Sequence, residues 1–473
     1  MVEHLTFQLI HLELSHWYLP GASFQIILSD SYEAELKTSS LLREHFQRRW
    51  YAPGEAAEEN SMHAVTRLRR LAASIPSRIG RPATRTTYVP QIDGVRFLAI
   101  ALVILWHISL RGSRFAGSLN EKGGHVHDFY AWFPHGEVGV ALFFFISGYV
   151  IAQPFLFRPR DQWRIGRFYA QRARRIYPPY LIAITGCLAI VTTTGFASRD
   201  FGVSVLQSWA ASLFYLHGLL FDVPSRVDPP IWSLEVEIQF YLLSPFIIWA
   251  YTWQRRGNTR IIVGFVAVAA LILMASLVDF VSPFDGRFRF GLLAHLYLFV
   301  AGIVAADLAR LRSASLKHPS TGFDVLLATG LSLLICIGLY LTLVDARPGG
   351  GWPDILCDFG LVTAALAIVF GALAGHIGQK IMGAPWVALI GTMCFSIYLT
   401  HVVVIEAISS LLNRLPLHSG AAIWGIGILV LTPSALAVGL LYYVVVERPF
   451  MTSAPFKAPS RLIPEAGRDV AES

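Results

Sequence analysis

The chain has 473 residues, of which 54% are hydrophobic and only 15% are charged. Soluble domains carry about a quarter of charged residues, so this composition excludes an ordinary soluble protein and indicates one that crosses a membrane repeatedly. Lys and Arg outnumber Asp and Glu by 38 to 31, an excess that suits loops facing anionic lipid, and no long basic tract suggests a nucleic-acid partner.

Residues 1–90 differ from the remainder because they are polar and mixed in charge. They contain no basic segment followed by an apolar one, so the sequence predicts no cleavable signal peptide. We expect residues 1–90 to be a cytoplasmic, partly disordered extension and residues 91–447 to form one membrane domain. Residues 448–473 are expected to be a short cytoplasmic tail without an appended soluble domain.

Ten apolar segments of spanning length follow the extension, each close to the 20 residues that a bilayer-crossing helix needs. They lie near residues 94–112, 136–157, 176–196, 232–253, 259–280, 290–309, 323–344, 356–376, 386–411 and 421–446. The predicted fold class is therefore an all-α polytopic membrane protein with about ten transmembrane helices.

An eleventh apolar stretch, residues 206–221, has only 16 residues, and the basic loops decide its status. Residues 158–175 carry seven arginines against one aspartate, and residues 254–260 and 310–318 are also basic. Positive charge gathers in cytoplasmic loops. All three loops fall on the cytoplasmic side only if residues 206–221 do not span, so we expect a re-entrant or interfacial helix there. Both termini would then be cytoplasmic.

The first span, "VRFLAIALVILWHISLR", places Arg96 and His107 within an apolar run. Eleven residues correspond to about three helical turns, so both side chains share a face, about 16 Å apart along the axis. An ionisable residue deep in a bilayer costs about 2–3 kcal/mol and usually faces a polar cavity. A neutral histidine satisfied by a neighbouring helix, with a snorkelling arginine, would give the same pattern.

Two further segments carry polar residues at positions where chemistry or packing can explain them. Ser147 lies mid-span beside Gly148, where small residues permit close helix packing or an opening. Arg172 and Arg175 are three residues apart on one face of a helix, a spacing that suits phosphate groups but is also that of an ordinary basic anchor.

The segment "PPIWSLEVEIQFYLLSPF" brings Glu235 and Glu237 into a span. A carboxylate at that depth needs a buried imidazolium or arginine as its partner, unless both acids are solvated among the headgroups. A carboxylate bonded to a histidine would orient the ring and raise its basicity, as a general base requires. Tyr398 and His401, in "FSIYLTHVVV", share a helical face and could line a substrate cavity or form a satisfied core pair.

Six segments in this order resemble the successive signatures of the acyltransferase-3 family of integral membrane enzymes. The resemblance covers about residues 90–450, and the order of the segments makes it specific. The segments are "IDGVRFLAIALVILWH", "GVALFFFISGYVI", "FYAQRARRIYPPYLIAI", "PPIWSLEVEIQFYLLSPF", "FSIYLTHVVV" and "VERPF".

The resemblance implies transfer of an acyl group, commonly acetyl, from cytoplasmic acyl-CoA to a hydroxyl, often of a cell-surface glycan. It assigns His107 as the catalytic base and Glu237, rather than Glu235, as the acid that holds the imidazole or balances its charge. Arg172 and Arg175 would contact the CoA phosphates or shape the inner mouth, and Arg96 is a further candidate for the phosphates. Ser147, Trp232, Glu235, Tyr398 and His401 are candidates for the substrate side. Two departures are Glu235, where the family usually has a small residue, and Ala141, where many members carry an acid.

The resulting hypothesis is an O-acyltransferase that acts on a surface carbohydrate or a lipid-linked glycan, with acyl-CoA as a donor substrate and no tightly bound cofactor. Two alternatives stay open: an enzyme that modifies a small molecule such as an antibiotic or glycolipid, and a transporter or flippase that uses the same polar residues as its path. No metal is expected, because the four cysteines lie in or beside apolar segments without ligand spacing.

Overall fold

The computed structural model describes residues 66–67, 74–80, 88–121, 128–195, 202–281, 286–344, 351–412 and 419–451. The chain divides into two units, Met1–Ser74 and Ile75–Ser473, and the fold presented here is that of the second. The extension and the tail expected from the sequence lie mostly outside the described residues, so their predicted character stays a prediction.

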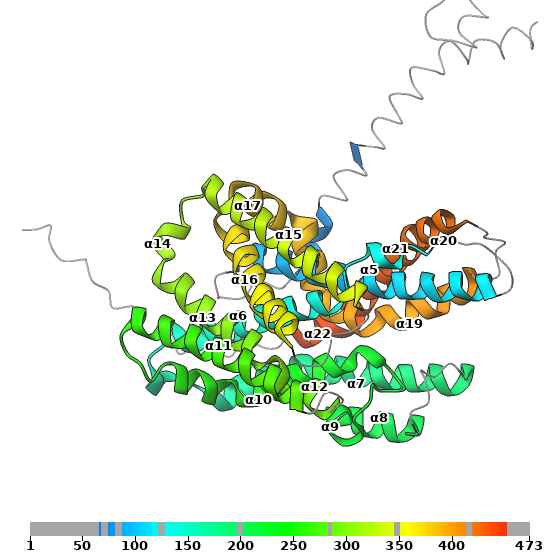
Figure 1. The fold of residues 1–473 in the computed structure, drawn as a ribbon, viewed down its shortest axis with the longest axis horizontal. Coiled ribbons are helices and arrows are strands. Elements are labelled where there is room, and N and C mark those ends of the chain that lie inside the picture. Colours follow the sequence, from blue (N-terminus) through cyan, green and yellow to red (C-terminus); the bar gives the residue numbers. More distant parts are fainter. Residues whose placement is uncertain are drawn as a thin grey trace, which may run out of the picture. The chain divides into compact units, whose positions relative to one another are not determined.

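The second unit is a bundle of long apolar helices, and no strand occurs in its described part (Figure 1). Ten helical segments there are long and apolar enough to cross a membrane, which confirms the predicted fold class. They are α5 (Pro90–Glu121), α6 (Glu137–Leu156), α7 (Ile165–Thr194), α10 (Trp232–Tyr251), α11 (Gly257–Val281), α13 (Leu292–Leu311), α15 (Thr321–Leu343), α16 (Trp352–Ala374), α19 (Cys394–Leu412) and the segment Gly420–Met451.

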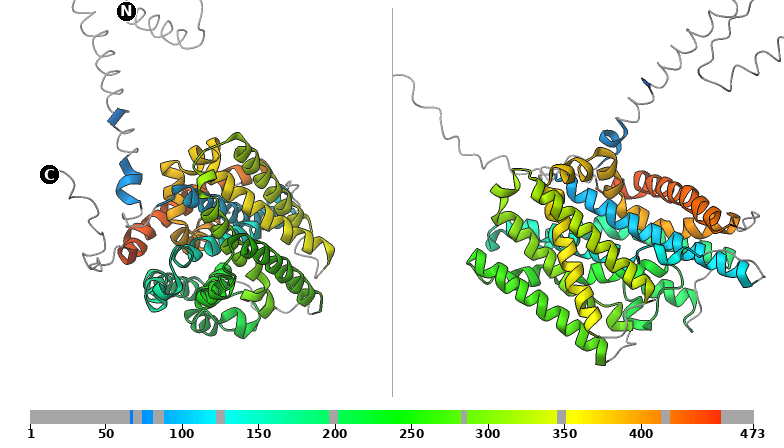
Figure 2. Two further views of the ribbon diagram at one scale, coloured as in Figure 1. Left: turned by 90° about the vertical axis from the view of Figure 1, so that its left-hand side faces the viewer. Right: turned by 45° about the horizontal axis from the view of Figure 1, so that its top comes forward.

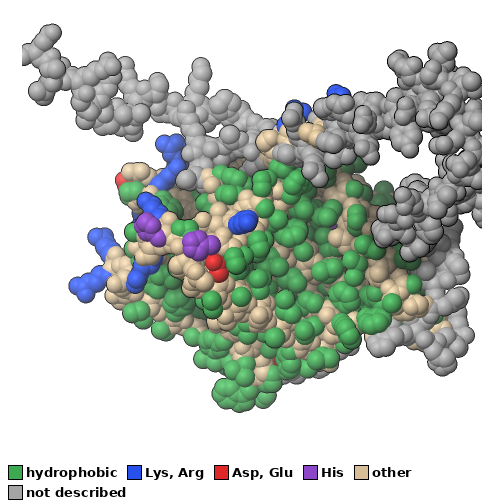
Figure 3. Space-filling view, turned by 90° about the horizontal axis from the view of Figure 1, so that it is seen from above, with side chains coloured by type: hydrophobic (Ala, Val, Ile, Leu, Met, Phe, Trp, Pro, Cys, Tyr) green, Lys and Arg blue, Asp and Glu red, His purple; other side chains and the backbone are tan. Residues whose placement is uncertain are grey.

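Shorter helices connect the spans. They are η1 (Tyr130–Trp132), η2 (Arg160–Gln162), α8 (Val205–Leu213), α9 (His217–Phe221), η3 (Pro229–Ile231), α12 (Gly286–Arg289), α14 (Ser313–Leu316), α17 (His376–Met382) and α18 (Pro385–Thr392). On the face drawn in Figure 3, hydrophobic side chains cover most of the described surface and basic side chains gather towards one edge. An apolar surface of this extent suits contact with lipid.

Helices α6 and α13 form the centre of the bundle, and two glycines set their separation. A Cβ atom at Gly148 would lie 2.1 Å from the carbonyl oxygen of Phe299, and one at Gly302 would lie 2.1 Å from that of Phe145. Neither position therefore has room for any side chain. The small residue beside Ser147 serves close packing, one of the two roles expected from the sequence.

The short apolar stretch at residues 206–221 does not span. It forms α8 and α9, which are only nine and five residues long. Ser204 and Gln207 cap the start of α8 reciprocally, and the backbone turns sharply at Tyr215 and Asp222, which both have positive φ. Because α9 is far shorter than a bilayer is thick, the count of ten spans holds.

Two spans expected to be continuous helices are interrupted. The segment predicted at residues 386–411 is divided into α18 and α19 at Met393. Gly391, near the end of α18, has the backbone of Asp93 so close that a Cβ would overlap it, so tertiary contact with α5 fixes this segment. The last span contains α20 (Gly420–Ile426), α21 (Thr432–Tyr442) and α22 (Arg448–Met451), joined by π-helical turns at Gly427–Leu431 and Tyr443–Glu447. Figure 2 shows α5 running beside α19 and this last span.

Candidate functional site

A cavity of about 100 Å³, which we call the arginine cavity, lies where α5, α6, α7, α10 and α19 meet. It brings together six residues that the sequence singles out, although they are spread over about 300 positions. The lining residues are Arg96, Phe143, Phe144, Ser147, Arg172, Arg175, Ile176, Ser233, Leu234, Glu237, Tyr241, Cys394, Phe395 and Tyr398.

The three arginines of this cavity are positioned in different ways. Arg96 donates a 2.7 Å hydrogen bond to Asp93, one turn earlier on α5. The guanidinium of Arg172 lies over the ring of Tyr241, 5.4 Å from its centroid, and makes no hydrogen bond within the described part of the chain. Arg175 lies 3.8 Å from the buried carboxylate of Glu447. The arginines thus keep donor groups for a ligand.

Among the residues that line the cavity, positive charges outnumber negative ones. Asp93 and Glu447 approach the arginines from outside the lining, and Glu237 is the only carboxylate among the lining residues. Because Asp93 and Glu447 each pair with one of these arginines, the attraction for an anion comes mainly from Arg172, which has no ion pair among the described residues, and the low local dielectric strengthens it.

Glu237 is held by two hydroxyl groups, since both Ser147 and Tyr241 donate hydrogen bonds to its carboxylate. The expected contact between Glu237 and the His107 imidazole is not seen among the described residues, so the role of this acid stays a prediction. The acid faces the arginine cavity, whereas His107 is not among the residues that line this cavity.

His107 pairs instead with a second histidine. The rings of His107 and His401 meet edge to face, with centroids 4.8 Å apart. Nδ1 of His107 lies 2.8 Å from the carbonyl oxygen of Val103, and Nδ1 of His401 lies 2.7 Å from that of Tyr398. A carbonyl only accepts, so each neutral ring carries its proton on Nδ1 and keeps Nε2 as an acceptor.

Tyr398 joins this histidine pair to the arginine cavity. Its side chain lines the cavity, and its ring centroid lies 5.6 Å from that of His401. The phenol donates to the carbonyl of Pro230 and lies 2.5 Å from Ser233 Oγ, so its orientation is fixed by the start of α10. His401 is fully buried, and its Nε2 has no hydrogen-bond partner in the described structure.

Two remaining candidates, Trp232 and Glu235, do not line the arginine cavity. Glu235 is fully buried and accepts hydrogen bonds of 3.1 and 2.9 Å from the backbone amides of His217 and Gly218, so it caps the start of α9. Trp232 lines a second and larger cavity of about 390 Å³. The acid that departs from the family pattern thus fixes the short helices to α10.

Asp228, immediately before η3, is a buried carboxyl group that sequence reasoning missed. Only 4% of its surface is exposed, and burial raises its pKa to about 7. In the same connecting segment, burial lowers the pKa of His217, whose Nε2 lies 3.1 Å from Ser208 Oγ. Asp228 lies outside the apolar segments, and His217 is a single histidine within the stretch 206–221, so no spacing signal marks either residue.

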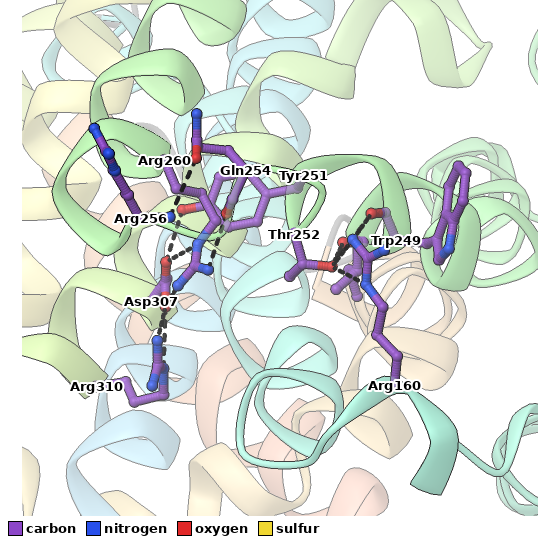
Figure 4. Close-up of polar contacts among 10 residues, drawn as sticks. Arg160, Trp249, Tyr251, Thr252, Gln254, Arg256, Arg260, Asp307 and Arg310 are labelled. Carbon is purple, nitrogen blue, oxygen red and sulfur yellow. Dashed lines mark hydrogen bonds and ion pairs between the residues drawn. The ribbon is translucent and has the colours of Figure 1, made fainter.

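A second arginine cluster lies around the buried carboxylate of Asp307, and none of its members lines the arginine cavity. Arg260 binds both oxygens of this buried carboxylate, at 2.7 and 2.9 Å, and Arg310 adds a 2.8 Å contact (Figure 4). Tyr251 donates to the same group at 3.1 Å. The cluster ties α10, α11 and α13 together, and its carboxylate is saturated by these donors.

The fold and the cavity define a class: a polytopic membrane protein with a buried, positively charged pocket beside a histidine pair. Residues 89–444 match the model of the acyltransferase-3 family, described as an acyltransferase domain. The chain belongs to this family of membrane acyltransferases.

The individual relatives that match the chain have low sequence identity to it. The peptidoglycan O-acetyltransferase OatA of Listeria monocytogenes is 25% identical over 346 residues, which cover 69% of this chain and 51% of that protein. The O-acetyltransferase OatA of Staphylococcus aureus is 23% identical over 342 residues, or 68% of this chain and 51% of that protein. The chain thus spans about half the length of these relatives. No solved structure matches it significantly.

Proposed function

We propose that the protein transfers an acyl group, most simply acetyl, from acyl-CoA to a hydroxyl of a cell-surface carbohydrate or lipid-linked glycan. The observation that carries the proposal is the arginine cavity, where three guanidinium groups face one carboxylate. The family match and the O-acetyltransferase names of its relatives support the same reaction class.

The size of the cavity limits which part of the donor it holds. Its volume of about 100 Å³ lies below the ~300–1,000 Å³ of pockets that enclose drug-sized ligands. It therefore takes the acyl group and the end of the pantetheine arm, while the CoA phosphates stay at the mouth beside Arg172 and Arg175. Forked hydrogen bonds from guanidinium groups suit phosphate oxygens.

His107 is proposed as the general base, with His401 as its partner. Nε2 of His107 takes the proton of the acceptor hydroxyl while the oxygen attacks the thioester carbonyl. The carbon–sulfur bond breaks, a carbon–oxygen bond forms, and the imidazolium returns the proton to the CoA thiolate. His401 offers a second Nε2 acceptor, which would stabilise the extra proton during this step.

The proposed orientation places both termini in the cytoplasm of a bacterium and the domain in its inner membrane. Basic residues between α6 and α7, α10 and α11, and α13 and α15 would then lie on the cytoplasmic side. Ten spans return the chain to the side from which it starts. Reporter fusions test this, because a fusion after α6 must report the cytoplasmic side and a fusion after α7 must report the opposite side.

The decisive experiment compares envelope glycans by mass spectrometry in a deletion strain that is complemented with wild-type or variant protein. His107→Ala should abolish the acyl groups that wild type restores, at an equal level of folded protein in the membrane. His318→Ala, an exposed histidine in a basic loop, is the matched control and should restore them fully. Near wild-type acylation by His107→Ala would overturn the base assignment.

A further inference from the structure

The larger cavity, which we call the carboxylate cavity, lies against the first turns of α6 and α10. Glu137 begins α6 and Trp232 begins α10, and both line this cavity. Tyr241, nine residues further along α10, lines the arginine cavity. The two cavities therefore follow one another along the same helix. A volume of about 390 Å³ is within the range of small-ligand sites.

A single aromatic layer separates the two cavities. Phe144 lines the arginine cavity, while Trp232 and His295 line the carboxylate cavity. The three ring centroids lie 5.2 to 6.3 Å from one another. A group bound in the carboxylate cavity is thus one ring away from the place proposed for the acyl donor.

The two cavities have opposite charge. The described lining of the larger one includes five carboxyl groups against one guanidinium, namely Glu137, Asp222, Asp279, Asp354 and Asp358 against Arg289. This composition repels an anionic ligand and favours a neutral or positively charged one. Carboxylates accept hydrogen bonds from hydroxyl and amine groups, and the Trp232 ring offers a face to a cation.

Two polar atoms in the lining point to a missing ligand. Ser276 is 8% exposed, and its Oγ has no hydrogen-bond partner among the described residues. Oδ1 of Asp222 is also buried without a partner there. Buried polar groups are almost always paired, so a hydroxyl-bearing ligand would complete both.

We propose that the carboxylate cavity is the acceptor site and that it binds a carbohydrate without negative charge, an amine-bearing sugar most tightly. The ligand donates hydrogen bonds to Asp222 and Ser276, and one of its hydroxyls faces the aromatic layer. This inference rests on the proposed function in two respects, namely that the chain acylates a hydroxyl and that the acyl donor binds in the arginine cavity.

Binding can be tested without the donor. The purified full chain in detergent is titrated calorimetrically with three tetrasaccharides: N-acetylglucosamine oligomer, its deacetylated glucosamine form and a galacturonic acid oligomer. The glucosamine oligomer should bind most tightly and the uronic acid oligomer least. Asp222→Asn should weaken glucosamine binding about tenfold, and Ser276→Ala should weaken both uncharged and amine-bearing oligomers.

Two further variants frame the result. Arg289→Gln removes the single cation and should tighten glucosamine binding, while Asp161→Asn, an exposed aspartate elsewhere, should change nothing. Equal binding of all three oligomers, absence of binding, or unchanged affinities in the Asp222 and Ser276 variants would overturn the proposal. Binding as expected without acylation from acetyl-CoA would instead refute the proposed reaction and leave the site in place.

Discussion

Arginines occur at two places in this bundle, and their partners differ. In the Asp307 cluster, Arg260 and Arg310 share one carboxylate through contacts of 2.7 to 2.9 Å. In the arginine cavity, Arg172 rests on aromatic rings, and Arg175 is 3.8 Å from its acid. A structural arginine uses its N–H donors in hydrogen bonds within the protein, whereas an arginine that binds a ligand keeps some of these donors available for it. The identity of the residue does not distinguish these cases, but its hydrogen bonds do.

The largest effect should come from Asp307→Ala. Removing this carboxylate leaves two buried or half-buried guanidinium groups without their acid, which should lower the unfolding free energy by about 3 kcal/mol. Thermal unfolding in detergent measures this loss, and Asp161→Ala, an exposed aspartate, should show none. Acyl transfer per folded molecule should be retained. A stable but inactive Asp307→Ala protein would break the comparison.

Arg172→Gln should have the opposite effect to Asp307→Ala: it should lower activity and leave stability nearly unchanged. The side chain makes no hydrogen bond within the described structure, so its removal should leave the unfolding temperature nearly unchanged. If it binds the donor, kcat/KM for acetyl-CoA should fall about 100-fold, the cost of losing a charge-assisted contact of 2–3 kcal/mol. Steady-state kinetics with radiolabelled acetyl-CoA measure this, with the exposed Arg174→Gln as control. A large loss of stability without a change in KM would contradict the assignment.

Asp228 sharpens the comparison because it is a buried acid without an arginine. Its pKa rises from 3.8 to about 7 in the folded protein, so folding binds a proton. The stability that this proton provides is full below pH 4 and is lost as the pH rises towards 7, by at most about 1.4 kcal/mol per pH unit. Asp228→Asn should remove this loss. Unfolding temperatures from pH 4 to 8 test it, because the advantage of the variant should grow up to pH 7 and then level off.

The smallest effect should distinguish Tyr398 from Tyr442, although both phenols donate a hydrogen bond to the carbonyl of a proline. Tyr398 donates to the carbonyl of Pro230 beside the arginine cavity, and Tyr442 donates to that of Pro179 outside the cavity lining. Each Tyr→Phe change should cost about 1 kcal/mol of stability. Only Tyr398→Phe should also lower acyl transfer, by about tenfold, because it disturbs the support of His401. Equal activities in the two variants would remove Tyr398 from the site.

Hydropathy alone predicts the ten spans, because lipid admits few charges over about 20 residues. The basic loops were sufficient to exclude residues 206–221 from the spans. The break at Met393 was not predictable, since it depends on contact with α5 rather than on composition. Long-range register has no local sequence signal.

The candidate site, like the fold, could be predicted from the sequence only in part. Helical spacing identifies Arg172 and Arg175 as neighbours, and the structure places both in the arginine cavity. Spacing on one helix gives no information on which residue of another helix faces it, so the sequence did not indicate that Glu237 accepts hydrogen bonds from Ser147 and Tyr241. Tyr241 was missed because a tyrosine in an apolar run looks like an ordinary core residue. Its hydroxyl nevertheless bonds Glu237.

The glycine contact between α6 and α13 has a mechanical consequence. Because their backbones are in contact at Gly148 and Gly302, these two helices resist sliding or rotating against each other and form one rigid unit. Ser147 and Phe144, which line the arginine cavity, lie on α6 and so belong to this unit. Any movement that admits substrates must come from the helices around this unit. Crosslinking α6 to α13 should therefore leave catalysis intact.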